Sequence, residues 1–226
     1  FEEALKQPQE TVFAEADPTL DIEGMDTAHK LTILCSLAWG MELNLDDIYV
    51  EGITRIDSMD IEFAKQFGFT IKLLAIGKFA EDAVEARVHP TMIPTGNMLS
   101  NVSGSLNAIS VAGDAVQDIL LYGRGAGMMP TASAVIGDIV DITRNQMLGV
   151  SNRVPGLSYQ PQHIRKIPIK PIEEIRTHYY FRFSALDQPG VLSKVSGILG
   201  EKGISIVTVH QKGRDRKGAV PIVMLT

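Results

Sequence analysis

The sequence predicts an α/β (α+β) protein, in which a mixed or antiparallel sheet is covered by helices and a smaller unit follows. Three compositional regimes along the 226 residues lead to this prediction. Residues 1–148 alternate segments of helical and strand period, separated by compact glycine and asparagine turns. Residues 149–176 carry four prolines and no sustained periodicity, which is typical of a linker. A new strand pattern begins at residue 177 and continues to residue 226.

The elements expected in the first region follow from side-chain spacing and turn residues. Leu31, Leu34 and Ala38 lie on one stripe, which predicts a helix over 24–38. Asp57 or Ser58 is a suitable N-cap for a second helix over 58–67. Strands are expected at 49–55, in an antiparallel pair of 70–78 with 83–94, and in a hairpin of 107–113 with 115–122.

A glycine-rich turn over 123–130 leads into a helix expected over 131–144. This helix is apolar on nearly every face, so we expect it to be buried. The turn has two interpretations: it feeds a buried helix, or its glycines let the backbone approach an anion or a polar ring. It is not a dinucleotide fingerprint, because no glycine stands at the sixth position of the pattern.

The second region reads as strand, helix, strand, strand. Residues 178–185 alternate like a half-buried strand, and the turn 187–190 leads into a helix whose apolar side chains form one stripe. Strands are expected at 204–212 and 219–225. This order is the first two-thirds of a ferredoxin-like βαββαβ unit.

Composition and charge exclude several functions. The formal net charge of −6 provides no broad basic surface, so we expect no nucleic-acid partner. The apolar run 31–41 is much shorter than the roughly 20 residues that cross a bilayer, so we expect no membrane span. The single cysteine, Cys35, cannot form an internal disulfide and favours a cytoplasmic location. The five histidines lack metal-ligand spacing, and no metal site is expected.

Acidic residues and one lysine gather before and within the first expected helix. Asp26 and Lys30 are spaced i,i+4 and project from one helix face, while Glu15 and Asp21 lie in the loop that leads to it. One interpretation is a surface ion pair that contributes about 0.3–0.5 kcal/mol. The other is a site for an amino-acid substrate, because carboxylates pair with an ammonium group and a lysine can transfer a proton to or from oxygen.

Two segments resemble one enzyme family. The stretch 14–30 is similar to the signature of homoserine dehydrogenase, whose fixed positions are Asp17, Pro18, Asp21, Ile22, Gly24, Asp26 and Lys30. The block 107–135, with its Gly-x-Gly-Ala-Gly run, resembles a second segment of that family. Residues 186–192 resemble the strand-to-helix turn of an ACT regulatory domain.

The resemblance implies an enzyme that interconverts L-homoserine and L-aspartate 4-semialdehyde with NAD or NADP, in the synthesis of threonine, methionine and isoleucine. It implies that Lys30 is the catalytic acid/base and Asp26 its partner. Glu15 and Asp21 would bind the amino-acid end of the substrate. Gly125 and Gly127 would approach a cofactor that is held mainly by an N-terminal nucleotide-binding domain, which this sequence lacks.

The ACT resemblance implies an effector site, with threonine as the candidate ligand, at Asp187, Gly190 and Val191. The ACT-like part stops before its second helix and fourth strand, and the chain starts at Phe1, so we expect a piece of a longer enzyme that is inactive alone and forms a dimer or tetramer. The alternative is a non-catalytic, dimeric amino-acid sensor. A piece of a bifunctional aspartate kinase–homoserine dehydrogenase is disfavoured, since that enzyme carries its regulatory segments before the dehydrogenase.

Overall fold

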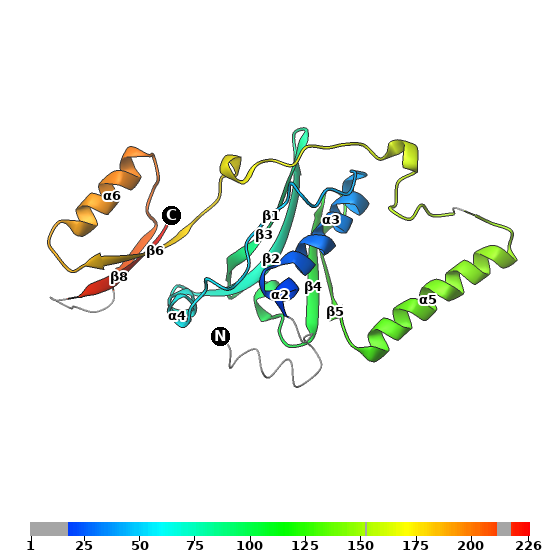
Figure 1. Cartoon of the computed structure of the whole chain (residues 1–226), viewed down its shortest axis with the longest axis horizontal. Coiled ribbons are helices and arrows are strands. Elements are labelled where there is room, and N and C mark those ends of the chain that lie inside the picture. Colours follow the sequence, from blue (N-terminus) through cyan, green and yellow to red (C-terminus); the bar gives the residue numbers. More distant parts are fainter. Residues whose placement is uncertain (1–17, 152, 212–217) are drawn as a thin grey trace. The chain divides into compact units, whose positions relative to one another are not determined.

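The computed structural model describes residues 18–151, 153–211 and 218–226. It divides into two compact units, the first ending at Glu174 and the second comprising Ile175–Thr226 (Figure 1). Both units combine helices with small sheets, which confirms the predicted α/β (α+β) class. Among the described residues, no helix combines the length and the apolar character needed to cross a membrane.

A three-stranded mixed sheet forms the centre of the first unit, with strand order β1-β3-β2. Strands β2 (Phe69–Ala80) and β3 (Ala83–Pro94) pair antiparallel over their whole length, which confirms the pair predicted for 70–78 and 83–94. Strand β1 (Tyr49–Val50) pairs parallel to β3. The strand predicted over 49–55 is therefore much shorter, because the backbone N–H of Ile53 donates to the carbonyl of Ile22 at 2.8 Å, outside the sheet.

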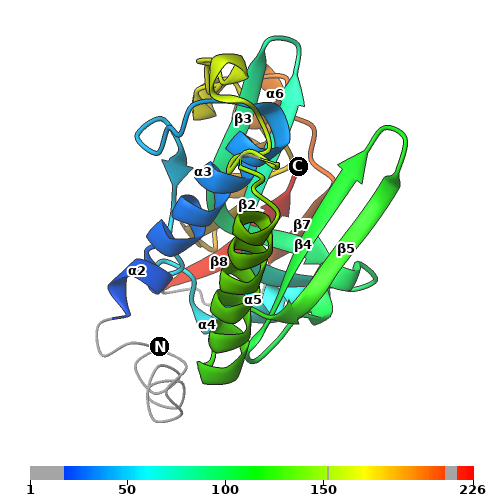
Figure 2. The ribbon, with the colours of Figure 1, turned by 90° about the vertical axis from the view of Figure 1, so that its right-hand side faces the viewer.

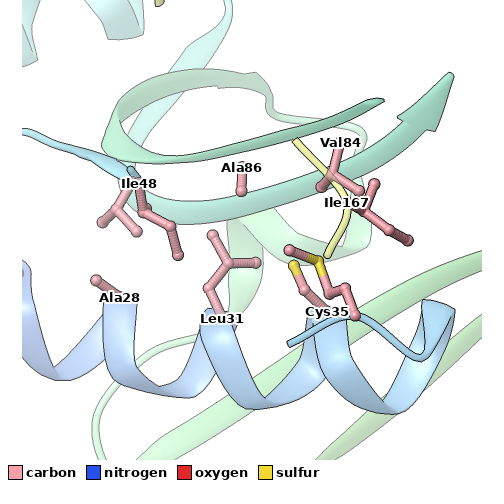
Figure 3. Close-up of a cluster of buried hydrophobic side chains, with 9 residues drawn as sticks. Ala28, Leu31, Cys35, Ile48, Val84, Ala86 and Ile167 are labelled. Carbon is pink, nitrogen blue, oxygen red and sulfur yellow. The ribbon is translucent and has the colours of Figure 1, made fainter. Parts of the chain in front are cut away.

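Helix α3 (Met25–Trp39) lies on one face of this sheet (Figure 2). Its inward side chains are Ala28, Leu31 and Cys35, which recur at helical spacing and are at most 4% exposed. They pack against Ile48, Val84, Ala86, Val88, Met41 and Ile167 (Figure 3). Burial raises the pKa of the Cys35 thiol to about 11, so this thiol is a packing group and not a nucleophile.

The stretch 157–170, in the range expected to be a linker, packs along the first unit. Ile167 is part of the buried core, and Arg165 pairs with Met41 in a parallel bridge. The hydroxyl of Tyr159 donates to the carbonyl of Ala38 at 3.0 Å, which secures the stretch to the end of α3. Two short 3-10 helices, η2 (Pro161–His163) and η3 (Ile172–Glu174), lie within or just after it.

Helix α4 (Ser58–Gln66) follows β1 and packs on β2 through Phe63 and Ala64. Its N-cap is Asp57, one of the two predicted caps. The Asp57 carboxylate accepts the backbone N–H of Asp60, and the Asp60 carboxylate accepts the backbone N–H of Asp57, each at 3.1 Å. This reciprocal pair fixes where the helix begins. A single 3-10 turn, η1 (Met98–Asn101), follows β3.

Beyond η1 come the predicted hairpin of β4 (Leu106–Gly113) and β5 (Gln117–Arg124), and then helix α5 (Met128–Met147). The expectation that this helix is buried is wrong for this chain, since none of its described residues is buried. Its apolar side chains are 41–87% exposed at Met128, Met129, Val135, Ile136, Ile139, Val140, Ile142 and Met147. Apolar composition favours burial, but the described residues supply no surface that covers this helix.

The second unit is a three-stranded antiparallel sheet with order β6-β8-β7 and one helix. Its elements are β6 (Tyr180–Leu186), α6 (Val191–Glu201), β7 (Thr208–Gln211) and β8 (Ala219–Leu225), in the predicted order. The central strand β8 is the core of the unit, with Val220, Ile222, Val223 and Met224 at most 4% exposed. The rings of Tyr179, Phe181 and Phe183 stack along one edge strand at 5.8 Å spacing.

A buried cation lies within the first sheet. The side chain of Arg87 on β3 is 4% exposed, and its Nη1 donates to Glu85 Oε2 at 2.7 Å. Its Nε donates to His89 Nε2 at 3.2 Å. The hydrogen bond from Arg87 lowers the pKa of Glu85 below its ordinary value, the nearby positive charges act in the same direction, and burial opposes them.

The contact between Tyr159 and Gly40 generates a first prediction, on stability. Gly40 and Gly68 both have left-handed backbones, with φ of 62° and 79°. A Cβ at Gly40 would lie 2.7 Å from the Tyr159 ring, whereas nothing described lies within 4 Å of one at Gly68. We expect Gly40→Ala to lower Tm by several degrees more than Gly68→Ala in thermal unfolding. Equal losses in the two variants would show that Tyr159 does not hold the stretch in place.

A second prediction concerns the pH dependence of stability. The folded pKa of Glu85 lies below its ordinary value of 4.5, so its ionised form stabilises the fold above that pH and the benefit disappears on acidification. Glu85→Gln should lower the free energy of unfolding by about 1–3 kcal/mol at pH 7, because Arg87 loses a charged partner. In denaturant titrations the difference in the free energy of unfolding between Glu85→Gln and wild type should shrink below pH 4.5.

Glu42→Gln, at an exposed glutamate, is the matched control, and its free energy of unfolding should stay close to that of wild type both at pH 7 and below pH 4.5. A constant difference for Glu85→Gln would contradict this account.

Candidate active site

The candidate site lies on the outward face at the start of α3. A short helix, α2 (Thr19–Ile22), is followed by Glu23 and by Gly24, whose φ of 83° lets the chain turn into α3. Asp26 and Lys30 are the second and sixth residues of α3. Lys30 Nζ donates to Asp26 Oδ2 in an i,i+4 ion pair, so the structure brings these two predicted residues together.

The ion pair is open to solvent in this chain. The side chains of Lys30 and Asp26 are 65% and 40% exposed, and Ile33, one turn further along, is also exposed. An exposed pair of this kind contributes at most about 0.5 kcal/mol to folding. The fold therefore depends little on it, and the Lys30 ammonium group is accessible to a ligand.

The structure describes only one of the two other residues that are predicted to bind the substrate. Asp21 lies in α2 with its side chain exposed, and its backbone carbonyl accepts the N–H of Gly24 at 3.2 Å. It thus belongs to the same turn that starts α3. Glu15 lies outside the described residues.

The two glycines predicted to approach a cofactor stand between β5 and α5. Gly125 is exposed, and a Cβ there would lie 2.6 Å from Nδ2 of the exposed Asn107, so the Asn107 side chain lies directly against this glycine. Gly127 has a φ of 122° and is the N-cap of α5, where no described side chain caps the helix. The N–H groups of Met128 and Met129 are in the first turn of that helix, which suits a negatively charged or polar group.

The predicted effector residues lie together at the start of α6. Asp187 Oδ1 accepts a hydrogen bond from Gln211 Nε2 at 3.1 Å, which connects the end of β6 to β7. Gly190 is the N-cap of α6 in a left-handed conformation, and Val191 is the first residue of the helix. Across the described parts of the chain, no group of three or more His, Cys, Asp or Glu side chains is placed to hold a metal ion.

Comparisons with known proteins identify the family. Residues 1–140 match the family model described as homoserine dehydrogenase, and residues 179–226 match the ACT domain. The chain belongs to the homoserine dehydrogenase family. This confirms the resemblance seen in the signature and in the glycine-rich block.

Individual relatives agree with the family model. A homoserine dehydrogenase from Pseudomonas aeruginosa is 46% identical over 100% of this chain and 52% of its own length. One from Helicobacter pylori is 49% identical over 94% of this chain and 48% of its own length. The crystal structure of a homoserine dehydrogenase from Thiobacillus denitrificans has a TM-score of 0.90 at 46% identity, covering 99% of this chain and 51% of that one. The chain thus spans about half the length of the curated relatives it matches.

Sequence reasoning missed the residues that hold the homoserine dehydrogenase signature in place. Gly52 and Ile53 contact the backbone of Ile22 and Glu23, directly before α3. The only signal in the sequence is a glycine that interrupts a strand-like run, which indicates close approach of another backbone but does not say which one.

Proposed function

We propose that this chain provides the substrate-binding and regulatory part of a homoserine dehydrogenase, which interconverts L-homoserine and L-aspartate 4-semialdehyde with NAD or NADP. The observation that carries the proposal is the Asp26–Lys30 pair, which projects from the open face of a helix whose other face is buried, at the matching positions of the family signature. The reaction class follows from the family, and the accessible Lys30 amine supports its assignment as the proton-transfer group.

The proposed chemistry assigns one step to each group. When homoserine is oxidised, its hydroxyl proton passes to the Lys30 amine as the carbon–oxygen bond becomes a carbonyl. In the reverse direction the Lys30 ammonium group returns that proton to the aldehyde oxygen. The nicotinamide, when bound, supplies or accepts the hydride. Asp26 accepts a hydrogen bond from the Lys30 ammonium group, which holds the side chain in one orientation between turnovers.

Substrate recognition is proposed for the carboxylates around the turn before α3. Asp21 is exposed beside Gly24, and with Glu15 it would bind the ammonium group of the substrate. Carboxylates suit this role because a paired ammonium group keeps its charge when it leaves water.

The cofactor is proposed to be held mainly by the part of the enzyme that the relatives have beyond this chain's span. This chain contains no Gly-x-Gly-x-x-Gly sequence, and its contribution is the backbone at Gly125 and Gly127. The φ of 122° at Gly127 and the N–H groups that open α5 fit a polar cofactor group at that edge.

The assembled enzyme is proposed to be a cytoplasmic dimer or tetramer. Apolar side chains of the β4–β5 hairpin support association, because Ile109 pairs with Leu121 and Val111 with Ile119 on one face, and all four are 38–58% exposed. The reduced, buried thiol of Cys35 is compatible with a cytoplasmic location.

The catalytic assignment is tested by changing Lys30 in the complete gene product. Lys30→Ala should lower kcat for homoserine oxidation by about 10²–10⁴, the scale of a lost general acid/base. The free energy of unfolding should change by less than about 0.5 kcal/mol, because the ion pair is exposed.

Two further variants separate charge from proton transfer. Lys30→Arg keeps the positive charge beside Asp26 but cannot release a proton, so its kcat should fall about as far as that of Lys30→Ala. Lys65→Ala, at an exposed lysine of α4, is the matched control and should retain wild-type kcat. Near-normal turnover in Lys30→Ala would remove Lys30 from the mechanism.

Threonine is proposed as the effector of the ACT domain, bound near Asp187, Gly190 and Val191. In the complete gene product, threonine should inhibit homoserine oxidation. Asp187→Ala should raise the half-inhibitory threonine concentration about tenfold or more, when each variant is compared with its own activity without threonine. Asp46→Ala, at an exposed aspartate in the first unit, should leave that concentration unchanged. Equal sensitivity in Asp187→Ala and Asp46→Ala would place the effector elsewhere.

A further inference from the structure

The segment that follows β1 connects the sheet to the turn before α3. The backbone N–H of Glu51 donates to the carbonyl of Val88 on β3 at 2.8 Å. Two residues later, the N–H of Ile53 donates to the carbonyl of Ile22, also at 2.8 Å. One short segment is therefore hydrogen-bonded to the central strand at one end and to the last residue of α2 at the other.

Between these two bonds, Gly52 lies directly against the turn. A Cβ at Gly52 would lie 2.3 Å from the Ile22 carbonyl oxygen and 2.6 Å from the Glu23 Cα. Both are backbone atoms, so no change of side-chain rotamer could relieve the overlap. The backbone at Gly52 is not left-handed, and glycine is needed here for close approach and not for its φ angle.

A second contact constrains the same turn from the sheet. A Cβ at Gly24 would lie 3.2 Å from Val88 Cγ1 and 3.3 Å from Val50 Cγ1, so the turn rests on side chains of β3 and β1. Gly24 is the N-cap of α3, and its carbonyl accepts the N–H of Ala28 at 3.0 Å. The position of this turn thus sets the first turn of α3, where Asp26 lies.

We infer that the segment Glu51–Ile53, acting through Gly52, is a positioning element that sets where α3 presents Asp26 and Lys30 to the substrate. The inference rests on the function proposed above. Gly52 touches no reacting atom in this scheme and acts only through the backbone of the α2–α3 turn.

The size of the effect follows from the overlap. Real Cβ contacts are longer than 3.0 Å, so a methyl group at Gly52 must move the turn by about 0.7 Å from the 2.3 Å approach. Misplacing a catalytic group by about 1 Å costs up to roughly 10² in rate. The inner face of α3 stays packed on the sheet through Ala28 and Leu31, so the displacement should be concentrated at the start of the helix. Asp26 lies there, and its ion pair transmits the displacement to the Lys30 side chain.

The test compares two glycine-to-alanine changes in the complete gene product. Gly52→Ala should lower kcat for homoserine oxidation about 10- to 100-fold, with the KM for the nicotinamide cofactor within twofold of wild type. Gly96→Ala is the matched control, because its φ is not left-handed and nothing described lies within 4 Å of an added Cβ. Its kcat should match wild type. Equal kcat values for Gly52→Ala and Gly96→Ala would overturn the inference.

A double-mutant cycle separates positioning from general damage. If Gly52 acts through Lys30, adding Gly52→Ala to Lys30→Ala should cause no further loss of kcat. If Gly52→Ala causes a structural defect unrelated to Lys30, kcat of the double variant should fall by the product of the two single-variant factors. That result would contradict the inference. If Lys30→Ala alone keeps normal turnover, the proposed catalytic role fails. If Lys30→Ala is impaired but Gly52→Ala behaves like Gly96→Ala, only the positioning inference fails.

A milder pair of variants serves if Gly52→Ala does not fold. Val50→Ala removes methyl groups that support Gly24, and Val84→Ala removes the same groups from β3, where Val84 packs in the same core. We expect Val50→Ala to lower kcat several-fold and Val84→Ala to leave it unchanged in the folded protein. The Val50→Ala loss should again vanish in the Lys30→Ala background. A kcat loss of equal size in Val50→Ala and Val84→Ala would contradict the inference.

Discussion

The packing of α3 on the β2–β3 sheet is the constraint on which the rest of the first unit depends. Ala28, Leu31 and Cys35 pack against the strands with almost no exposure to solvent, and the small side chain of Ala28 allows the helix and the sheet to approach closely. Because the inner face of the helix is buried against the sheet, the helix is fixed in position. Charged residues on its outer face therefore have a fixed place while they stay exposed. Asp26 and Lys30 occupy that face, so a rigid core presents a polar pair to solvent or ligand.

The helix is held at both ends by backbone hydrogen bonds and side-chain contacts from distant segments. At the start, Gly24 rests on the sheet and the preceding carbonyl of Ile22 is bound by Ile53. At the end, Gly40 lies under the Tyr159 ring, and its carbonyl accepts the N–H of Arg165 at 2.9 Å. Both glycines have a left-handed φ, and a Cβ would meet Val88 and Val50 at 3.2–3.3 Å at Gly24 and the Tyr159 ring at 2.7 Å at Gly40.

Local patterns predicted most elements of the fold, and long-range contacts account for the differences. The helix over 24–38 follows from its apolar stripe, and the antiparallel pair 70–78 with 83–94 follows from two strand-like runs joined by a short turn. The structure has both within one or two residues at each end. The strand over 49–55 is shorter because its backbone turns to α2, which no local period reveals. At the site, the i,i+4 spacing predicted that Asp26 and Lys30 share a face, whereas the roles proposed for them come from the resemblance to the family signature. Gly52 could not be found, because its partner lies some thirty residues earlier in the chain. The boundaries at residues 148 and 176 stay predictions.

The uncovered apolar surface of α5 bears on how this polypeptide behaves in solution. A 20-residue helix with exposed methionine, valine and isoleucine side chains, and a preceding hairpin that exposes Ile109 and Leu121, offer other molecules a large apolar surface. When it is warmed or concentrated, the chain of residues 1–226 should aggregate before its core unfolds. Its apparent melting temperature should then vary with scan rate and protein concentration. Denaturation studies are therefore best carried out on dilute samples, with light scattering recorded alongside.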